Sequence, residues 1–380
     1  MTGFDSVRTD ESSTDVEIPF PLVPEKSEEL LSDKQVFDYR NRRERFAKWL
    51  LVFGKDPERI EGYSEATAKR TMYRVGAFER WVWKQEGEYT PEPTLDHADN
   101  YMEMLAFGNK SQSHKAACQH SILRYFKWRH HEYDEEQWDP DHSFSTPDYN
   151  QPRDYLTIEE RKKLRRVALD WRELPYYQNY TPDEREAMKP YIAKRVDKPT
   201  DSLSREDWND LTSWKVTSLV WTSLDTGLRP IEVERATTEW VDTENAVLRI
   251  PHEESSKNSE NWVVSLRDDT AEVLAEWLEE RSYKPMYDDT DTLWLTQKGN
   301  PYTSRQLRRL IRKLCDEAGI RTDNRSMSWY SIRHSVGTWM TREEDLAAAQ
   351  AQLRHKRSET TMKYDSAPPD DRRDALDRTG

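Results

Sequence analysis

An acidic, proline-containing segment at residues 132–154 divides this sequence of 380 residues into two parts. The segment has eight acidic residues against one basic residue, and Pro140, Pro147 and Pro152 interrupt it. Proline and a high density of like charge oppose regular secondary structure, so the composition predicts a linker. A chain of this length is large enough for two or three domains. We therefore expect separate domains before and after the linker.

The part before the linker has the apolar periodicity of amphipathic helices. Apolar residues recur every three to four positions in four stretches, a spacing that places them on one helical face. The pattern predicts a compact helical bundle over residues 35–131. The four stretches are residues 36–53, a second that begins after Ser64, residues 95–107, and a fourth that begins near Ser113.

Charged residues are unevenly distributed along the chain. The formal net charge is −14, but residues 1–34 alone contain nine acids and three bases, and the linker is similarly acidic. Residues 303–357, in contrast, contain twelve bases and six acids. A local basic surface of this kind can bind phosphate groups whatever the total charge. We expect residues 1–34 to be a disordered acidic tail, and the general acidity suggests a salt-adapted cytoplasm.

The part after the linker combines helices with short strands. Thr157 and Glu160 form a capping-box pattern at the start of one helix, and Gly227 ends a buried helix. Residues 171–212, rich in proline and charge, suggest an insertion or a mobile loop. Strands are predicted at residues 246–252, 261–266 and 292–296, and helices at residues 214–225, 303–318, 328–341 and 344–353.

The fold class expected from these elements is mainly α with a small antiparallel β-sheet, an α+β fold. The second domain is expected to span residues 155–366, followed by a short polar tail at residues 367–380. No run approaches 18 apolar residues, so no helix is expected to cross a membrane. Cys118 and Cys315 are far apart, which argues against a disulfide framework and a cysteine-built zinc site and favours the cytoplasm.

Candidate site residues begin with Arg229, which follows Gly227 at the end of the predicted buried helix. Glu232 comes three residues later, so it lies on the same helical face and can orient the Arg229 guanidinium. Alone, this pair is equally well explained as an ion pair at a helix boundary. Lys257 lies in a polar turn between two predicted strands, where it could give a proton to a leaving oxygen. Taken alone, a solvated turn lysine is the simpler explanation.

The other candidates lie towards the C-terminus. Tyr330 and Arg333 are three residues apart, which places both on one face of a helix, and His334 follows directly. His355 and Tyr364 are nine residues apart. Isolated histidines and tyrosines are usually structural, so none of these residues is informative by itself.

A tyrosine among fixed positive charges has a distinct chemistry. A phenol loses its proton only near pH ~10, so alone it is a poor nucleophile at neutral pH. Surrounding cations can stabilise the charge that develops on pentavalent phosphorus when the phenol attacks a phosphodiester. Tyr364, together with the scattered basic residues, therefore predicts a chain that cuts and rejoins DNA through a phosphotyrosine bond.

The order and spacing of these residues resemble the tyrosine recombinase, or phage-type integrase, family. That family has an arginine and a glutamate three residues apart, a hairpin lysine, an arginine–histidine pair, and a final histidine nine residues before the nucleophilic tyrosine. The resemblance covers residues 153–366, which makes this part the catalytic domain, and residues 35–131 are similar in kind to the family's core-binding domain. The matching positions are Arg229, Glu232, Lys257, Arg333, His334, His355 and Tyr364.

Two positions depart from the family pattern. Tyr330 stands where the family has a histidine, and a tyrosine can donate a hydrogen bond to phosphate but is a weak base near neutrality. Arg354 stands where the family usually has glycine. We expect Arg354 either to contact phosphate or to point into solvent.

The resemblance implies a site-specific recombinase that forms a 3′-phosphotyrosyl link through Tyr364. Lys257 is then expected to protonate the leaving 5′-oxygen. No cofactor and no metal are implied, because side chains supply the positive charge. The implied partners are double-stranded DNA with paired recombination sites and further copies of the chain in a homotetramer. Stabilising contacts to the phosphate are assigned to Arg229, Tyr330, Arg333 and His355.

Three alternatives remain open from the sequence. A type IB topoisomerase would use the same residues but would reseal its own cut without a partner site. A DNA-binding relative that has lost catalysis is favoured by Tyr330 alone. A helical interaction protein would require the motif matches to be accidental.

Overall fold

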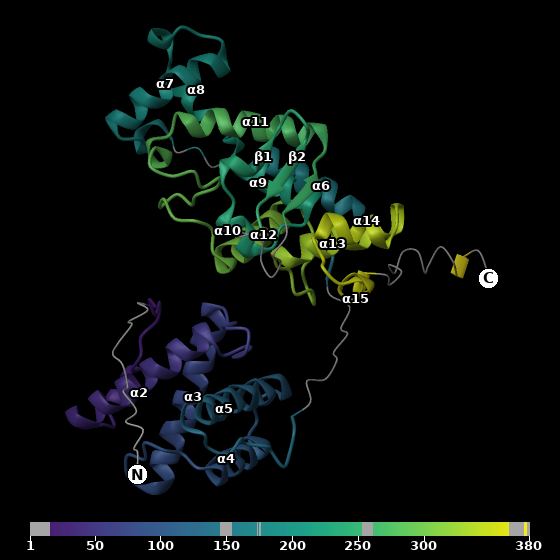
Figure 1. The fold of residues 1–380 in the computed structure, drawn as a ribbon. Coiled ribbons are helices and arrows are strands. Elements are labelled where there is room, and N and C mark those ends of the chain that lie inside the picture. The colour runs from purple at the N-terminus through teal and green to yellow at the C-terminus, as the bar shows by residue number, and fades with distance from the viewer. Residues whose placement is uncertain are drawn as a thin grey trace, which may run out of the picture. The chain divides into compact units, whose positions relative to one another are not determined.

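The computed structural model describes residues 16–144, 154–172, 174, 176–252, 261–364 and 376–377. The chain divides into two compact units, residues 1–149 and residues 150–380 (Figure 1). Each unit has its own hydrophobic core, so each is described by itself.

The first unit is helical throughout its described residues. Its core is formed mainly by α2, α3, α4 and α5, and Thr94 caps α4 by accepting a hydrogen bond from the backbone N–H of His97. Gly87, with φ of 74°, ends α3 in the left-handed conformation that glycine adopts without strain. The helices are α1 (Glu25–Glu28), α2 (Asp33–Val52), α3 (Glu65–Glu86), α4 (Leu95–Phe107) and α5 (Gln112–Tyr133).

Residues 20–34 do not behave as the disordered tail expected from composition. Phe20 is buried in the core of the helical unit, and the Arg43 guanidinium donates a hydrogen bond to the Leu22 carbonyl. The expectation failed because the acid count was averaged over a segment that contains a short apolar run at residues 18–23. Residues 1–15 lie outside the described residues.

The first half of the predicted linker also packs on the helical unit. Trp138 is buried in the same core. The side-chain amide of Gln119 donates a hydrogen bond to the His142 carbonyl at 2.5 Å and accepts one from the Phe144 N–H at 3.0 Å. The linker prediction was wrong for this half because it depended on the number of acidic residues and not on the apolar side chains between them. Residues 145–153 are not among the described residues.

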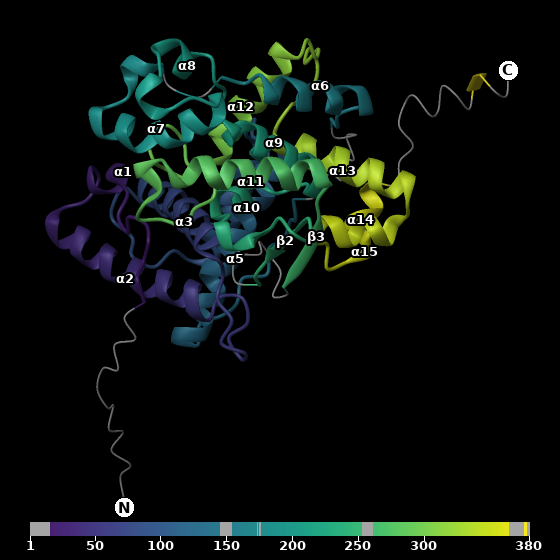
Figure 2. The same cartoon turned by 90° about the horizontal axis from the view of Figure 1, so that it is seen from above.

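The second unit is built around α9, whose side chains are almost all buried. This helix packs against α6, α11 and α13 (Figure 2). The α-helices of the unit are α6 (Ile158–Leu169), α7 (Pro182–Val196), α8 (Arg205–Asn209), α9 (Trp214–Thr226), α10 (Pro230–Arg235), α11 (Asp268–Ser282), α12 (Ser304–Glu317), α13 (Trp329–Glu343), α14 (Leu346–Leu353) and α15 (Ser358–Thr361). Short 3-10 helices are η1 (Tyr177–Asn179), η2 (Thr200–Ser202), η3 (Thr238–Trp240), η4 (Pro285–Tyr287) and η5 (Met362–Tyr364).

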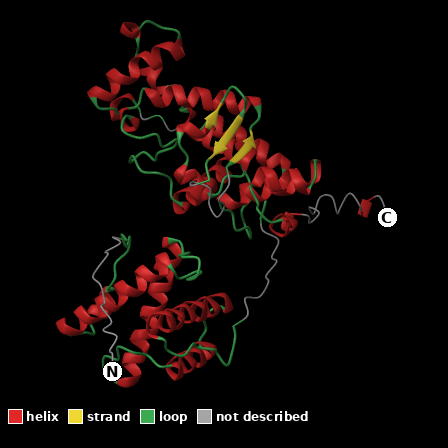
Figure 3. Ribbon diagram, in the orientation of Figure 1, coloured by secondary structure: helices red, strands yellow, loops and turns green. Residues whose placement is uncertain are grey.

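A three-stranded antiparallel sheet covers part of this core (Figure 3). Its strands β1 (Val241–Asp242), β2 (Val247–Ile250) and β3 (Trp262–Ser265) follow one another in sequence order. The mainly helical fold with a small antiparallel sheet confirms the predicted fold class.

The strand predicted at residues 292–296 was wrong. These residues make only isolated bridges, Thr237 with Thr292 and Leu295 with Pro301, while the edge strand of the sheet is β1. The apolar run instead places Leu293, Trp294 and Leu295 side by side in the core. A short buried run has the same composition whether or not it pairs with a neighbouring strand.

The insertion predicted at residues 171–212 contains α7 and α8 and has a small core of its own. Glu280, a fully buried carboxylate on α11, connects this layer to the main core. It accepts hydrogen bonds from the Ser213 hydroxyl at 2.5 Å, the Trp214 N–H at 2.7 Å and the Tyr191 hydroxyl at 3.3 Å. The segment is therefore an attached helical layer rather than a mobile loop.

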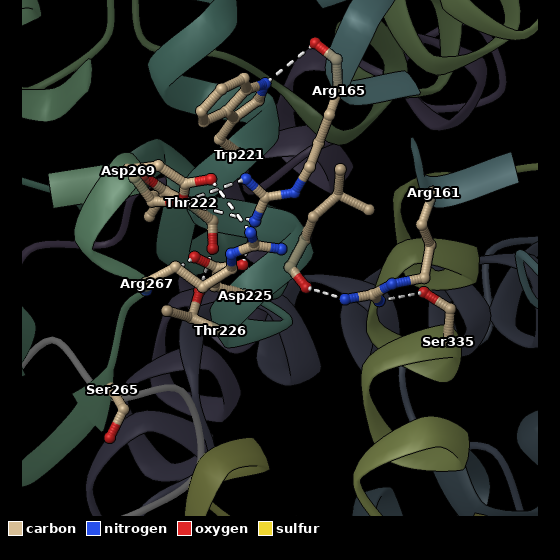
Figure 4. A network of polar contacts seen from close by, with 12 residues as sticks. Arg161, Arg165, Trp221, Thr222, Asp225, Thr226, Ser265, Arg267, Asp269 and Ser335 are labelled. Atoms are coloured by element: carbon tan, nitrogen blue, oxygen red, sulfur yellow. Dashed lines mark hydrogen bonds and ion pairs between the residues drawn. The ribbon is translucent and has the colours of Figure 1, made fainter. Parts of the chain in front are cut away.

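Figure 4 shows the polar network that fixes the end of α9. Arg161 on α6 donates to the Ser335 hydroxyl of α13 at 2.8 Å, and Arg165 forms an ion pair with Asp225. The Asp225 carboxylate also accepts the backbone N–H of Arg267 at 3.1 Å. Asp225 lies two residues before the turn that follows α9, so the network holds that turn in place.

No helix within the described ranges is long and apolar enough to cross a membrane. Both cysteines, Cys118 and Cys315, are buried thiols.

Candidate active site

The turn between α9 and α10 positions Arg229. Gly227 ends α9 with φ of 60°, and Arg229 is the N-cap residue of α10. The Glu232 carboxylate accepts the Arg229 backbone N–H at 2.7 Å and its guanidinium Nη1 at 2.6 Å. Glu232 is fully buried, so one carboxylate both caps the helix and orients the arginine, as the three-residue spacing predicted.

Arg333 joins this turn to the end of α14. Its guanidinium donates to the Gly227 carbonyl at 2.7 Å, to the Leu353 carbonyl, and to His355 Nε2 at 2.9 Å. A Cβ atom on Gly227 would lie 2.8 Å from the Leu353 side chain and 3.4 Å from the Arg333 Cα. Glycine is therefore required here both for its backbone conformation and for this close approach.

His355 is held as a neutral imidazole with a defined tautomer. An arginine N–H can only donate, so Nε2 of His355 accepts from Arg333 and Nδ1 carries the proton. That proton is donated to the Thr361 hydroxyl, 2.9 Å away. Burial lowers the pKa of His355, and Arg333 and Arg229 lower it further, to about 3. At neutral pH His355 thus contributes hydrogen bonds rather than positive charge.

Tyr364 lies in η5, directly after α15, and is buried with its ring between two histidines. The ring stacks on His355, with centroids 5.8 Å apart and planes 6° from parallel, and lies 5.3 Å from the His334 ring. A Cβ atom on Gly337 would come within 2.7 Å of the Tyr364 ring, so α13 needs glycine at this point. The predicted interval of nine residues therefore does bring His355 and Tyr364 together.

Arg354 behaves in neither of the two expected ways. Its side chain is fully buried, and its Nη2 donates to Glu232 Oε2 at 2.8 Å. It neither points into solvent nor reaches the surface where a phosphate could contact it, because its guanidinium bonds Glu232 and nearby carbonyl groups inside the protein. The sequence could not indicate this, since Arg354 and Glu232 are 122 residues apart.

The site has more positive than negative charge. Burial tends to raise the pKa of Glu232, but Arg354, Arg229 and Arg333 outweigh it and lower the pKa to about 2. Burial, Arg354 and Arg229 together lower the pKa of Arg333 to about 9. Two guanidinium groups thus bond one ionised carboxylate and a third acts on it electrostatically, which is an arrangement suited to an additional anion.

A comparison with protein families identifies this region. Residues 209–369 match the family model described as the phage integrase family. This region is a phage integrase domain. Every clustered residue described above lies inside the match, and the predicted recognition is confirmed. Among curated proteins, no significant match to the sequence is found.

Solved structures share the fold of the integrase domain and of the helical unit. XerH site-specific recombinase bound to difH substrate is 16% identical, with a TM-score of 0.54 over 89% of this chain and 88% of that one. A lambda integrase dimer bound to a COC′ core site is 12% identical, with a TM-score of 0.51 over 85% and 76%. This likeness shows the shared fold, and together with the family match over residues 209–369 it supports the site-specific recombinase that the sequence predicted.

The structure does not bring every predicted residue into the cluster of the integrase domain. Tyr330 lies on the first turn of α13 and is 43% exposed. Lys257, which falls between β2 and β3 in the sequence, lies outside the described residues. Among the residues that are described, no group of histidine, cysteine, aspartate or glutamate side chains could hold a metal ion.

Several residues of the cluster were missed by sequence reasoning. Thr361 fixes the tautomer of His355, and Gly337 makes room for Tyr364. Gln352 on α14 donates to the Ser265 carbonyl of β3 at 2.8 Å and to the Asp225 carbonyl of α9 at 3.0 Å. The only available signal was proximity in sequence, since Thr361 and Gln352 lie within three residues of Tyr364 and His355.

Proposed function

We propose that this chain binds double-stranded DNA and cuts and rejoins its strands with Tyr364 as the nucleophile. The observation that carries the proposal is the continuous cluster that joins Tyr364, His355, Arg333 and Arg229. XerH was solved bound to its difH substrate and lambda integrase bound to a core site, and such complexes of recombinases with DNA support DNA as the substrate.

In the proposed reaction, the Tyr364 hydroxyl loses its proton to solvent, and its oxygen bonds to the scissile phosphorus as the bond from phosphorus to the 5′-oxygen breaks. The product is a 3′-phosphotyrosyl link, and attack by a 5′-hydroxyl group reverses the step. Arg229 keeps some solvent access, with 13% of its side chain exposed, so it can reach a bound phosphate. Arg333 is more deeply buried and stabilises the developing charge from behind.

Other roles rest on the family resemblance. Lys257 protonates the leaving 5′-oxygen, and Tyr330, exposed one turn before Arg333, donates to a non-bridging oxygen. The protein acts in the cytoplasm as a homotetramer on paired recombination sites. These roles require neither a metal nor a nucleotide cofactor.

A nicked suicide substrate tests the nucleophile. The nick releases a short strand after cleavage, so the covalent protein–DNA adduct accumulates. Wild-type protein should form the adduct, and Tyr364→Phe should form none while still binding DNA. Tyr176→Phe, a change at an exposed tyrosine of the inserted layer, is the matched control and should react normally. An undiminished adduct in Tyr364→Phe would exclude this tyrosine as the nucleophile.

The same substrate separates the rival functions. A wild-type chain that binds DNA without any adduct would be a DNA-binding relative that has lost catalysis. Efficient relaxation of a supercoiled plasmid without target sites would instead indicate a topoisomerase.

A further inference from the structure

Arg354 occupies a backbone conformation that is unfavourable for an arginine. It is the C-cap residue of α14 and has φ of 56° and ψ of 53°, in the left-handed region. This conformation costs a residue with a Cβ atom roughly 1–2 kcal/mol. Its side chain is also fully buried, which adds the cost of removing a charge from water. Both costs must be offset by what the guanidinium does.

The guanidinium connects three elements of the site. Its Nη1 donates to the Thr226 carbonyl at 2.9 Å and to the Gln352 carbonyl at 2.8 Å. Its Nη2 donates to the Gly227 carbonyl at 3.4 Å and to Glu232 Oε2 at 2.8 Å. These groups belong to the end of α9, the first turn of α10 and the end of α14.

The two carboxylate oxygens of Glu232 accept hydrogen bonds from two different arginines. Oε1 accepts from the Arg229 guanidinium, while Oε2 accepts from Arg354 and from the Arg229 backbone. One carboxylate cannot neutralise two cations. With Arg333 included and His355 neutral, the cluster has a formal charge of about +2, and without Arg354 it would have about +1.

The surplus matches the charge of the proposed transition state. A phosphodiester under attack by a phenolate develops two negative charges at pentavalent phosphorus. Arg354 itself is too deeply buried to touch the phosphate, so it can affect the reaction only without direct contact, through its charge and through the groups that it bonds.

We propose that Arg354 is a positioning residue for strand cleavage. By binding Oε2 of Glu232, it leaves the Arg229 charge only partly neutralised and available to the scissile phosphate. The same contacts hold the α10 turn against α14, so Arg229 and His355 keep a fixed relation. This inference rests on the proposed function and extends it to a residue that does not contact the substrate.

Arg354→Gly is the first test, because glycine adopts this backbone conformation without strain. The variant should bind target DNA within about threefold of wild type. Its rate of adduct formation on the suicide substrate, with protein in excess, should fall by roughly 10–100-fold, less than for loss of a direct transition-state donor. Lys194→Gln, which removes another basic side chain bound to a glutamate (Glu279, 2.5 Å) in the same unit but outside the basic residues 303–357, is the matched control and should leave the rate unchanged.

A second substrate distinguishes an effect of the Arg354 charge from a purely structural effect of its side chain. A methylphosphonate at the scissile position replaces one charged oxygen with a methyl group, so its transition state needs less positive charge. The deficit of Arg354→Gly relative to wild type should therefore shrink on this substrate. A purely structural role would leave the deficit equal on both substrates, and that result would overturn the proposal.

A pair of size-matched variants covers the case in which Arg354→Gly does not fold. Arg354→Lys keeps a positive charge and Arg354→Gln does not, so the lysine variant should react at least about tenfold faster. Equal rates, or a wild-type rate in Arg354→Gly, would exclude the role proposed for Arg354. Failure of wild-type protein to form any adduct would count against the proposed function instead, so the two outcomes are distinguishable.

Discussion

Each unit of this protein buries an arginine–glutamate cluster, and the two clusters differ in charge balance. In the helical unit, Arg43 pairs with Glu79 at 3.1 Å, and Tyr39 donates to the same carboxylate at 2.6 Å. There a single arginine bonds the carboxylate, and Arg42, which donates to the Tyr125 hydroxyl, acts on it from further away. In the integrase domain, Arg229 and Arg354 share Glu232, and Arg333 adds a third cation nearby.

The difference distinguishes a structural pair from a site prepared for a ligand. The Nη2 and Nε groups of Arg43 donate to the Met72 and Leu22 carbonyls, so the hydrogen-bonding groups of the pair have partners within the protein. A cluster with surplus charge is costly until an anion arrives. Both clusters contain an arginine bonded to a buried glutamate, and the surrounding residues determine which of the two has surplus charge.

The largest expected effect comes from unbalancing the structural pair. Arg43→Met leaves the buried Glu79 carboxylate without its cation, which should cost the helical unit about 3–5 kcal/mol of stability. Urea unfolding measures this loss. Arg43→Met combined with Glu79→Gln should recover much of it, because no uncompensated charge remains. If the single variant were as stable as wild type, the pair would not support the helical unit.

Removing a cation from the surplus cluster should affect the reaction more than the fold. Arg229→Ala should slow adduct formation by about 10²–10³-fold, because Arg229 is partly exposed and is the donor proposed to contact the phosphate. Gel-shift assays should show nearly unchanged DNA affinity. A proportional loss of affinity would mean that Arg229 binds the ground state as tightly as the transition state.

Displacing the tyrosine without altering any charge should have a smaller effect. Gly337→Ala places a methyl group 2.7 Å from the Tyr364 ring, and such overpacking costs about 1–3 kcal/mol. Adduct formation should slow, as measured on the suicide substrate. Gly108→Ala in the helical unit, where the new Cβ meets nothing closer than 3.4 Å, is the control. Equal rates for the two variants would show that the ring tolerates displacement.

The smallest expected effect is a loss of folding stability of the integrase domain as the pH falls below neutral. His355 has a pKa of about 3 in the folded protein against an ordinary 6.5, so the unfolded chain binds its proton at higher pH. Stability from this residue is complete above pH 6.5 and is lost as pH falls towards 3. Glu232, with a pKa of about 2 against an ordinary 4.5, adds a similar loss below pH 4.5.

His355→Gln tests the upper part of this range. Urea midpoints at pH 7.5, 6.0 and 5.0 should fall less steeply for the variant than for wild type. Parallel curves would indicate that His355 is charged in the folded state.

The sequence predicted the fold class and the approach of Tyr364 to His355, because local periodicity and a fixed interval along one short segment determine both. The Arg229–Glu232 pair was predictable for the same reason. The burial of Arg354 was not, because its partner is set by how α14 packs beside α10. Trp138 and Phe20 show a related limit, since single apolar side chains in acidic segments escape composition-based reasoning.

Under the proposed function, the setting of Tyr364 has a consequence for how a target phosphate is chosen. Its ring is wedged over Gly337 and stacked on His355, so the phenolic oxygen can travel little while α13 and α15 stay in place. A nucleophile held in this way cannot move along a DNA strand to reach the phosphodiester that is cut. The duplex must be bent, slid or rotated until one phosphate meets the oxygen, which makes DNA deformability a determinant of where the strand is cut.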